Sequence, residues 1–230
     1  RRLQRAGDRV VGPGALLGKP PRGFGGQRLE PRGRPLPGGL SPPGMLGPET
    51  LQGRLPGFAC GVLDGKVAPG STVAIVGAGP IGLAALLTAR LYSPSEIVLI
   101  DLDDKRLESA RRFGATRTVN NADGKAAEAV LAMTGGRGVD TAIEAVGIPE
   151  TFVLCQDLVA AGGIIANIGV HGAKVDLHLE RLWSRNIAIT TRLVDTVTTP
   201  LLLRTVQSGG IDPALLITHR FRLEAVSYTH

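Results

Sequence analysis

Three glycines spaced as G-x-G-x-x-G occupy residues 77–82, directly after an apolar run and at the start of a helical pattern. In this arrangement the first glycine permits a tight turn, the second lets the backbone approach a pyrophosphate, and the third allows close helix–strand packing. The N–H groups at the start of the helix favour phosphate charge. An ordinary strand–helix turn is the alternative. The predicted phosphate-binding residues are Gly77, Gly79, Pro80, Ile81 and Gly82.

A carboxylate supplies the second chemical signal. Asp101 ends an apolar run and lies 19 residues after Gly82. A carboxylate there accepts hydrogen bonds from the adenosine ribose hydroxyls and repels a 2′-phosphate. The two signals together predict a bound nicotinamide dinucleotide, and they favour NAD over NADP as the cofactor.

The elements that position these residues follow from the alternation of short apolar runs and amphipathic stretches after Ser71, which is typical of βα units on a parallel sheet. We expect Asp103 to begin the second helix, Gly114 to close it, and Gly162 and Gly163 to turn the chain before the fifth strand. The predicted fold class is α/β, a doubly wound parallel (Rossmann) sheet. The expected strands are 72–76, 97–101, 116–119, 139–145, 164–168 and 187–191, and the expected helices are 80–92, 103–113, 124–133, 150–160 and 199–208.

The first quarter of the chain has a different composition. Residues 1–57 contain 14 Gly, 10 Pro, ten basic and three acidic side chains, whereas the rest carries 16 basic and 17 acidic ones. Such a segment buries too little apolar surface to offset its ordering entropy. We therefore predict three regions: a basic segment at 1–54 that is either disordered or foreign to the fold, a dinucleotide-binding domain at 55–221, and an irregular tail at 222–230.

The charge and the cysteines limit the class of protein. The net charge of +6 comes from the basic segment, where Phe24 is the one aromatic residue available to stack on bases. We therefore expect no nucleic-acid partner; a basic arm that touches anionic partners is the alternative. No apolar run reaches the ~18 residues that span a bilayer. We therefore expect no membrane partner. Two cysteines make no disulfide framework, which favours the cytoplasm.

Several stretches between Phe58 and Phe221 together resemble the coenzyme domain of zinc-type alcohol dehydrogenases in the medium-chain dehydrogenase/reductase family. They are CGVLDGKV, PGSTVAIVGAGPIGLAAL, IDLDDKRLESARRFGA, GGRGVDTAIEAVG, the double-glycine turn and IGVHG. The resemblance implies hydride transfer between a small alcohol or carbonyl substrate and the nicotinamide cofactor. It also implies further cofactor contacts at Arg106, Ala145, Val146, Ile168, Gly169, Val170, Arg192 and Leu193.

The same resemblance implies a catalytic zinc, which polarises the substrate oxygen in that family. Residues 1–57 contain no Cys and no His, and the position matching one family ligand falls near Gln52. We therefore expect no metal ligand and no catalytic residue in this chain, and little turnover by the chain alone. A non-catalytic NAD(H)-binding module is the alternative function, and a homo-oligomer formed through the Rossmann sheet is a further expectation.

Five other side chains have competing interpretations. His171 follows a strand end and is either a proton relay or, as we expect, a polar loop residue. His178 and Glu180 suggest two metal ligands, but a solvated helix turn is the simpler interpretation. Cys155 lies on an apolar helix stripe and is expected in the core. Tyr92 is followed four positions later by Glu96 rather than Lys, which weakens the short-chain dehydrogenase alternative.

Overall fold

The computed structural model describes residues 56–193, 197–217 and 219–222. The segment predicted to be disordered at 1–54, and nearly all of the tail predicted at 222–230, lie outside the described residues. The domain boundaries therefore stay predictions.

Six parallel strands form one sheet in the order β3-β2-β1-β4-β5-β6. The order reverses between β1 and β4, which is the mark of a doubly wound sheet. The predicted α/β fold class is thereby confirmed. The strands are β1 (Thr72–Val76), β2 (Glu96–Asp101), β3 (Arg117–Asn120), β4 (Val139–Glu144), β5 (Val159–Asn167) and β6 (Ala188–Thr191).

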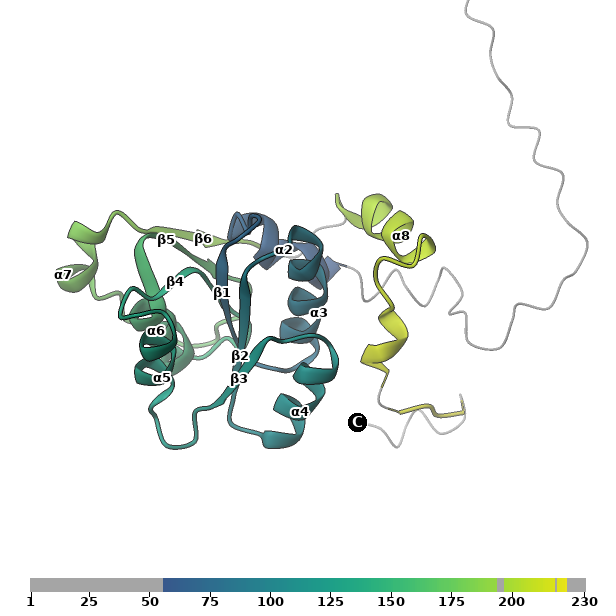
Figure 1. Cartoon of the computed structure of the whole chain (residues 1–230), viewed down its shortest axis with the longest axis horizontal. Helices are drawn as coiled ribbons and strands as arrows, with labels where there is room; N and C mark the ends of the chain where they lie inside the picture. Colours follow the sequence, from purple (N-terminus) through teal and green to yellow (C-terminus); the bar gives the residue numbers. More distant parts are fainter. Residues whose placement is uncertain (1–55, 194–196, 218, 223–230) are drawn as a thin grey trace, which may run out of the picture. The chain divides into compact units, whose positions relative to one another are not determined.

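Helices lie on both faces of the sheet (Figure 1). In β1, Val73 and Ile75 belong to a core with α2, α3 and α4, whereas Ala74 and Val76 belong to a core with α5 and α6. Strands covered on both sides have to be apolar at every position, which explains the unbroken run at 72–76. The helices are α2 (Pro56–Asp64), α3 (Pro80–Ala89), α4 (Asp104–Arg112), α5 (Ala126–Met133), α6 (Pro149–Leu158), α7 (Leu179–Leu182) and α8 (Thr199–Gln207).

The start of α4 agrees with the expected cap. The Asp103 carboxylate accepts a hydrogen bond of 2.8 Å from the backbone N–H of Lys105. A side chain that satisfies one of the unpaired N–H groups at a helix start typically stabilises the helix by about 1 kcal/mol. The cap fixes where α4 begins after β2, and Gly114 follows shortly after the end of the helix.

The turn predicted at Gly162 and Gly163 is wrong, because β5 runs through both glycines. Its register with β4 slips inside the strand: Val139 pairs with Val159, but Thr141 pairs with Ile164. A Cβ atom on Gly163 would lie 2.9 Å from the carbonyl oxygen of Asp140. The glycines therefore permit a bulge within the strand, where sequence reasoning expected a turn between elements.

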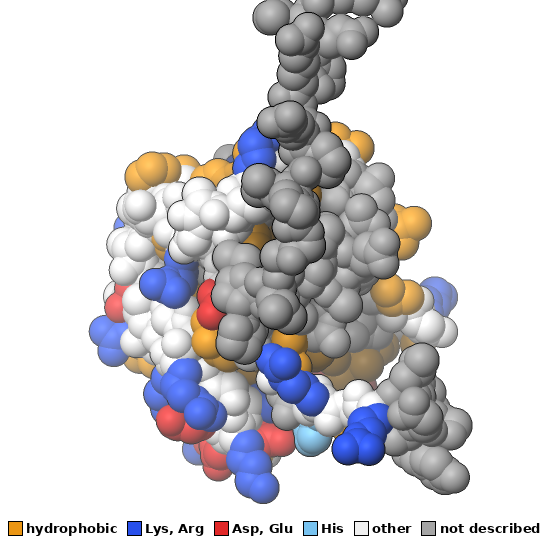
Figure 2. Space-filling model, turned by 90° about the vertical axis from the view of Figure 1, so that its right-hand side faces the viewer, with side chains coloured by type: hydrophobic (Ala, Val, Ile, Leu, Met, Phe, Trp, Pro, Cys, Tyr) orange, Lys and Arg blue, Asp and Glu red, His pale blue; other side chains and the backbone are white. Residues whose placement is uncertain are grey.

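The surface of the described residues carries mixed charge. In Figure 2, Lys and Arg side chains are scattered, and some lie beside acidic ones instead of forming one basic patch. No helix in the described ranges combines the length and apolar character needed to span a bilayer.

Candidate functional site

A cleft of about 550 Å³ opens at the carboxyl ends of β1, β2 and β4. Ligands of open α/β sheets bind in the crevice where the strand order reverses, and this cleft lies at that reversal. Its lining residues are Val76, Gly77, Gly79, Ile100, Asp101, Leu102, Asp103, Arg106, Asn121, Ala145, Val146, Ile148, Glu150, Thr151 and Leu154.

The three glycines of the motif have three different environments. Gly77 has φ +103°, and a Cβ there would lie 2.6 Å from Cγ2 of Val146. A Cβ on Gly82 would overlap the carbonyl oxygen of Gly77, so this glycine allows α3 to pack against the turn. A Cβ on Gly79 meets no atom within 4 Å. The fold therefore requires the first and third glycines, whereas at Gly79 the absence of a side chain keeps the cleft open.

The glycine turn leads directly into α3. Gly79 is the N-cap residue of this helix, and no side chain caps it. N–H groups of an uncapped first turn have no partner inside the helix, and the helix dipole adds partial positive charge there. This part of the cleft can therefore bind an anion such as a phosphate.

Asp101 connects the glycine turn to the end of β2. Its Oδ2 accepts a hydrogen bond of 2.7 Å from the N–H of Ala78, and its Oδ1 accepts bonds from Leu102 and Asp103 of 2.8 and 3.0 Å. Nη1 of Arg106 lies 3.8 Å from Oδ2, and the Asp101 side chain is only 9% exposed. The carboxylate is thus held rigidly on the cleft wall, and the predicted neighbours Asp101 and Arg106 do come together.

The adjoining wall contains two lining residues that sequence reasoning missed, Leu102 and Asn121. Leu102 is apolar yet 67% exposed, and Asn121 lies just beyond β3. Their signal in the sequence is positional, because Leu102 and Asn121 each come directly after a strand of a predicted parallel sheet. Of the residues implied by the resemblance, Ala145 and Val146 line this cleft as well.

A second carboxylate, Glu144, was also missed. It ends β4, is fully buried, and its Oε1 accepts hydrogen bonds from the N–H groups of Val146 and Gly147 and from the hydroxyl of Thr151. Burial and the nearby Glu144 charge raise the pKa of the Cys155 thiol well above its ordinary value. Cys155 is fully buried on α6, as expected. A charged residue directly after the apolar pair Ala142-Ile143, at the end of a strand, was the available signal for Glu144.

Five of the residues implied by the resemblance do not line this cleft. Ile168 is buried in the core with β1 and α3, whereas Val170 and Leu193 are 83% and 84% exposed. Gly169 packs against Oε2 of Glu144. The guanidinium of Arg192 forms an ion pair of 2.9 Å with Asp64. Their proposed contacts with the nicotinamide half therefore stay predictions.

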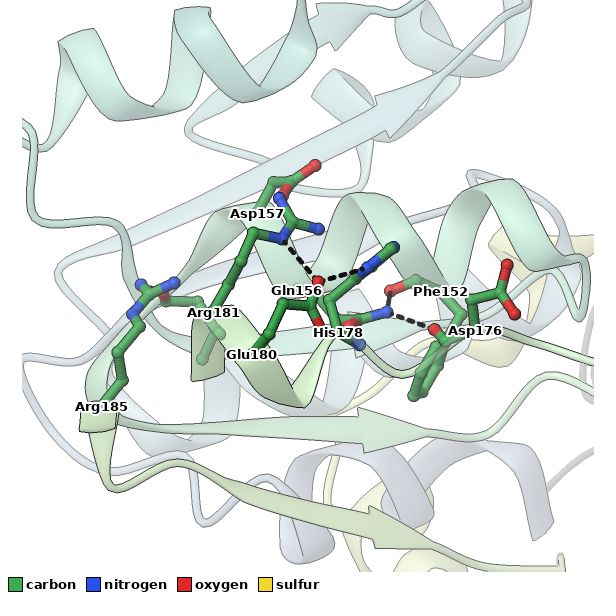
Figure 3. Close-up of polar contacts among 9 residues, drawn as sticks. Phe152, Gln156, Asp157, Asp176, His178, Glu180, Arg181 and Arg185 are labelled. Carbon is green, nitrogen blue, oxygen red and sulfur yellow. Dashed lines mark hydrogen bonds and ion pairs between the residues drawn. The ribbon is translucent and has the colours of Figure 1, made fainter. Parts of the chain in front are cut away.

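His178 and Glu180 lie next to one another, with 3.0 Å between Nδ1 and Oε1, at the start of the short helix α7 (Figure 3). The neighbouring Gln156 is buried on α6; its amide donates to the carbonyl of Asp176 and accepts from the N–H of His178. This network joins the segment before α7 to α6. Within the ranges described, no three His, Cys, Asp or Glu side chains form a group that could hold a metal ion.

Residues 80–207 match a family model described as zinc-binding dehydrogenase. Among curated proteins, an alcohol dehydrogenase of Cupriavidus necator is 32% identical over 199 residues, which cover 84% of this chain and 53% of that protein. This chain spans about half the length of the curated relatives it matches.

Two solved structures illustrate the structural similarity. The apo form of zinc dependent alcohol dehydrogenase 2 from Streptococcus pneumonia is 53% identical, with a TM-score of 0.76, over 80% of this chain and 54% of that one. A putative zinc-binding dehydrogenase from Sinorhizobium meliloti bound to NADP is 29% identical, with a TM-score of 0.66, over 69% of this chain and 48% of that one. The matched family model begins at Pro80, within the glycine turn, and covers both strand-end carboxylates and α6; this chain belongs to the zinc-binding dehydrogenase family.

Proposed function

We propose that the cleft binds NAD(H), and that the whole protein transfers hydride between this cofactor and an alcohol or carbonyl compound. The observation that carries the proposal is the glycine turn fixed to Asp101 at the reversal of strand order. The pyrophosphate is proposed to pass over Gly79, where a Cβ would meet no protein atom within 4 Å, and to approach the first turn of α3.

The adenosine half is proposed to occupy the described cleft. Asp101 accepts three backbone hydrogen bonds and keeps remaining acceptor capacity for the ribose hydroxyls, because a carboxylate offers about four lone-pair sites. Leu102 and Val146 offer exposed apolar surface on which a purine ring can pack. The side-chain amide of Asn121 adds a hydrogen-bond donor and an acceptor to the lining of the same cleft.

NAD is proposed as the preferred cofactor, because Asp101 places negative charge where a 2′-phosphate would lie. Arg106 favours the opposite preference, since its guanidinium lies 3.8 Å from Asp101 and its side chain is 59% exposed. We expect the carboxylate to dominate, because backbone hydrogen bonds hold it in place. Fluorescence titration with NADH and with NADPH tests this, and equal affinity or tighter NADPH binding would contradict the assignment.

Zinc is part of the family's description, but the residues described offer no ligand set that fits it. The proposed contribution of this chain is therefore to bind and orient the coenzyme. We expect the 230-residue chain alone to bind NADH without stoichiometric zinc and without oxidising alcohols. Metal analysis beside an assay of alcohol-dependent NADH formation tests this; one zinc per chain together with turnover would contradict it.

The non-catalytic alternative, a module that holds NAD(H) as a ligand, predicts the same binding. It differs in that the complete protein would show no alcohol-dependent NADH formation. The cytoplasm and a homo-oligomer formed through the sheet remain our proposals for location and assembly.

A further inference from the structure

Glu144 connects three segments through one buried carboxylate. Its Oε1 accepts hydrogen bonds of 3.0 and 2.9 Å from the N–H groups of Val146 and Gly147, and one of 2.7 Å from the hydroxyl of Thr151. Burying a carboxylate is costly unless hydrogen bonds replace its hydration. The first oxygen therefore organises the loop at 145–147, which lines the adenosine side of the cleft, and the start of α6.

The second oxygen faces the loop that follows β5. Oε2 lies 3.3 Å from Nε2 of His171 and has no hydrogen-bond partner among the described residues. The same Nε2 lies 2.8 Å from Oδ1 of Asn167, whose amide nitrogen donates to the carbonyl of Gly169. Since Oδ1 can only accept, Nε2 has to carry a hydrogen. This hydrogen is directed at Asn167, and Oε2 of Glu144 faces the same edge of the His171 ring at 3.3 Å.

The two loops pack closely against each other and against the carboxylate. A Cβ on Gly169 would overlap Oε2 of Glu144, and a Cβ on Gly147 would lie 2.5 Å from the carbonyl oxygen of Val170. The ring of His171 meets Phe152 of α6 edge to face, with 6.0 Å between centroids. The loops at 145–147 and 168–171 are therefore interlocked, with the carboxylate between them.

The two loops lie at the ends of β4 and β5, next to the reversal of strand order. A dinucleotide straddles this point, with one nucleotide over each half of the sheet. The glycine turn and Asp101 lie in the half formed by β1 and β2, so the other nucleotide extends towards β4 and β5.

We infer that Glu144 and His171 are positioning residues that hold the loop at 168–171 in the place where the nicotinamide half of the cofactor binds. The inference rests on the proposed function. A positioning role differs from a merely structural one because losing it weakens the binding of one part of the ligand only. Disturbing the pair weakens binding of the complete dinucleotide and spares binding of the ADP-ribose part.

Glu144→Gln disturbs the pair while nearly keeping its shape. If the amide oxygen replaces Oε1, the three donors there keep their acceptor, but the amide NH₂ then opposes the N–H of His171. His171→Phe removes the same contact from the other side and keeps an aromatic ring against Phe152. Glu128→Gln, at an exposed carboxylate of α5 outside the cleft lining, is the matched control.

The experiment measures the affinities of NADH and of ADP-ribose by calorimetry for the full chain, the two single variants, the double variant and the control. Each single variant is expected to bind NADH about tenfold more weakly. ADP-ribose affinity is expected to change by less than about twofold, and the double variant to be no weaker than the worse single one, because coupled residues are not additive. Thermal melts verify folding, and His171→Phe alone carries the ligand comparison if Glu144→Gln does not fold.

Equal losses for both ligands, or additive losses in the double variant, would overturn the inference. A failure of the original chain to bind either ligand is a different result, because it would overturn the proposed function instead.

Discussion

Asp101 and Glu144 are two carboxylates at equivalent places in the sheet, at the ends of the strands that flank β1 on either side. Each accepts N–H groups from the loop that follows its own strand. The Asp101 side chain is 9% exposed and lines the cleft, whereas Glu144 is fully buried and contacts α6 and the loop after β5.

One local arrangement thus serves two purposes in this sheet. A carboxylate at the end of a parallel strand organises the next loop in both cases. What covers the carboxylate decides whether its remaining acceptor capacity meets a ligand or another protein group. Four predictions follow from this contrast, from the largest expected effect to the smallest.

Glu144→Ala is expected to lower the free energy of unfolding by about 3 kcal/mol, because buried donors lose their charged acceptor. Two backbone N–H groups and the Thr151 hydroxyl would be affected. Urea unfolding measures the effect, and Asp101→Ala is the comparison. Equal or greater destabilisation by Asp101→Ala would break the contrast between the buried carboxylate and the cleft carboxylate.

Gly79→Val is expected to weaken NADH binding by at least about 100-fold, equivalent to ~2.7 kcal/mol, and to leave the fold intact. The added side chain enters space that holds no protein atom within 4 Å but that the pyrophosphate is proposed to occupy. Calorimetry with NADH and a thermal melt measure the two effects. Gly82→Val is the control, and it should destabilise the fold because its Cβ overlaps Gly77. Unchanged affinity in folded Gly79→Val would show that this glycine serves the turn alone.

Asp101→Ala is expected to narrow the ratio of NADH to NADPH affinity, and Asp101→Asn should do so by about tenfold with less loss of stability. The amide keeps an acceptor for backbone N–H groups but removes the charge that repels a 2′-phosphate. Parallel titrations of both cofactors measure the ratio. A ratio that stays constant in Asp101→Asn would assign the preference to another group on the cleft wall.

Cys155 gives the smallest expected effect, and it appears at alkaline pH. The pKa of its thiol is raised in the fold by burial and by Glu144, so the unfolded chain loses the proton first as pH rises. Stability is therefore lost above a pH of about 8.5, by up to about 1.4 kcal/mol per pH unit. Urea unfolding between neutral and alkaline pH should show a shallower loss for Cys155→Ala. Identical pH slopes would mean that the thiol contributes nothing.

The sequence determined those features that depend on short spacing. The G-x-G-x-x-G turn, Asp101 at a strand end and the apolar runs predicted the fold class, because backbone geometry and burial act over a few residues. Most element boundaries followed for the same reason. The bulge at Gly162 and Gly163 was read as a turn, because two glycines permit either structure and only pairing with β4 decides between them.

Tertiary structure alone decided which distant residues meet. Leu102 and Val146 share a cleft because their strands lie on either side of β1, and Arg192 reaches Asp64 across 128 positions of sequence. Glu144 is buried against His171 because α6 and the loop after β5 cover it, whereas the Asp101 side chain stays 9% exposed and lines the cleft. Sequence spacing places both carboxylates at strand ends, but only packing determines which one faces the cleft.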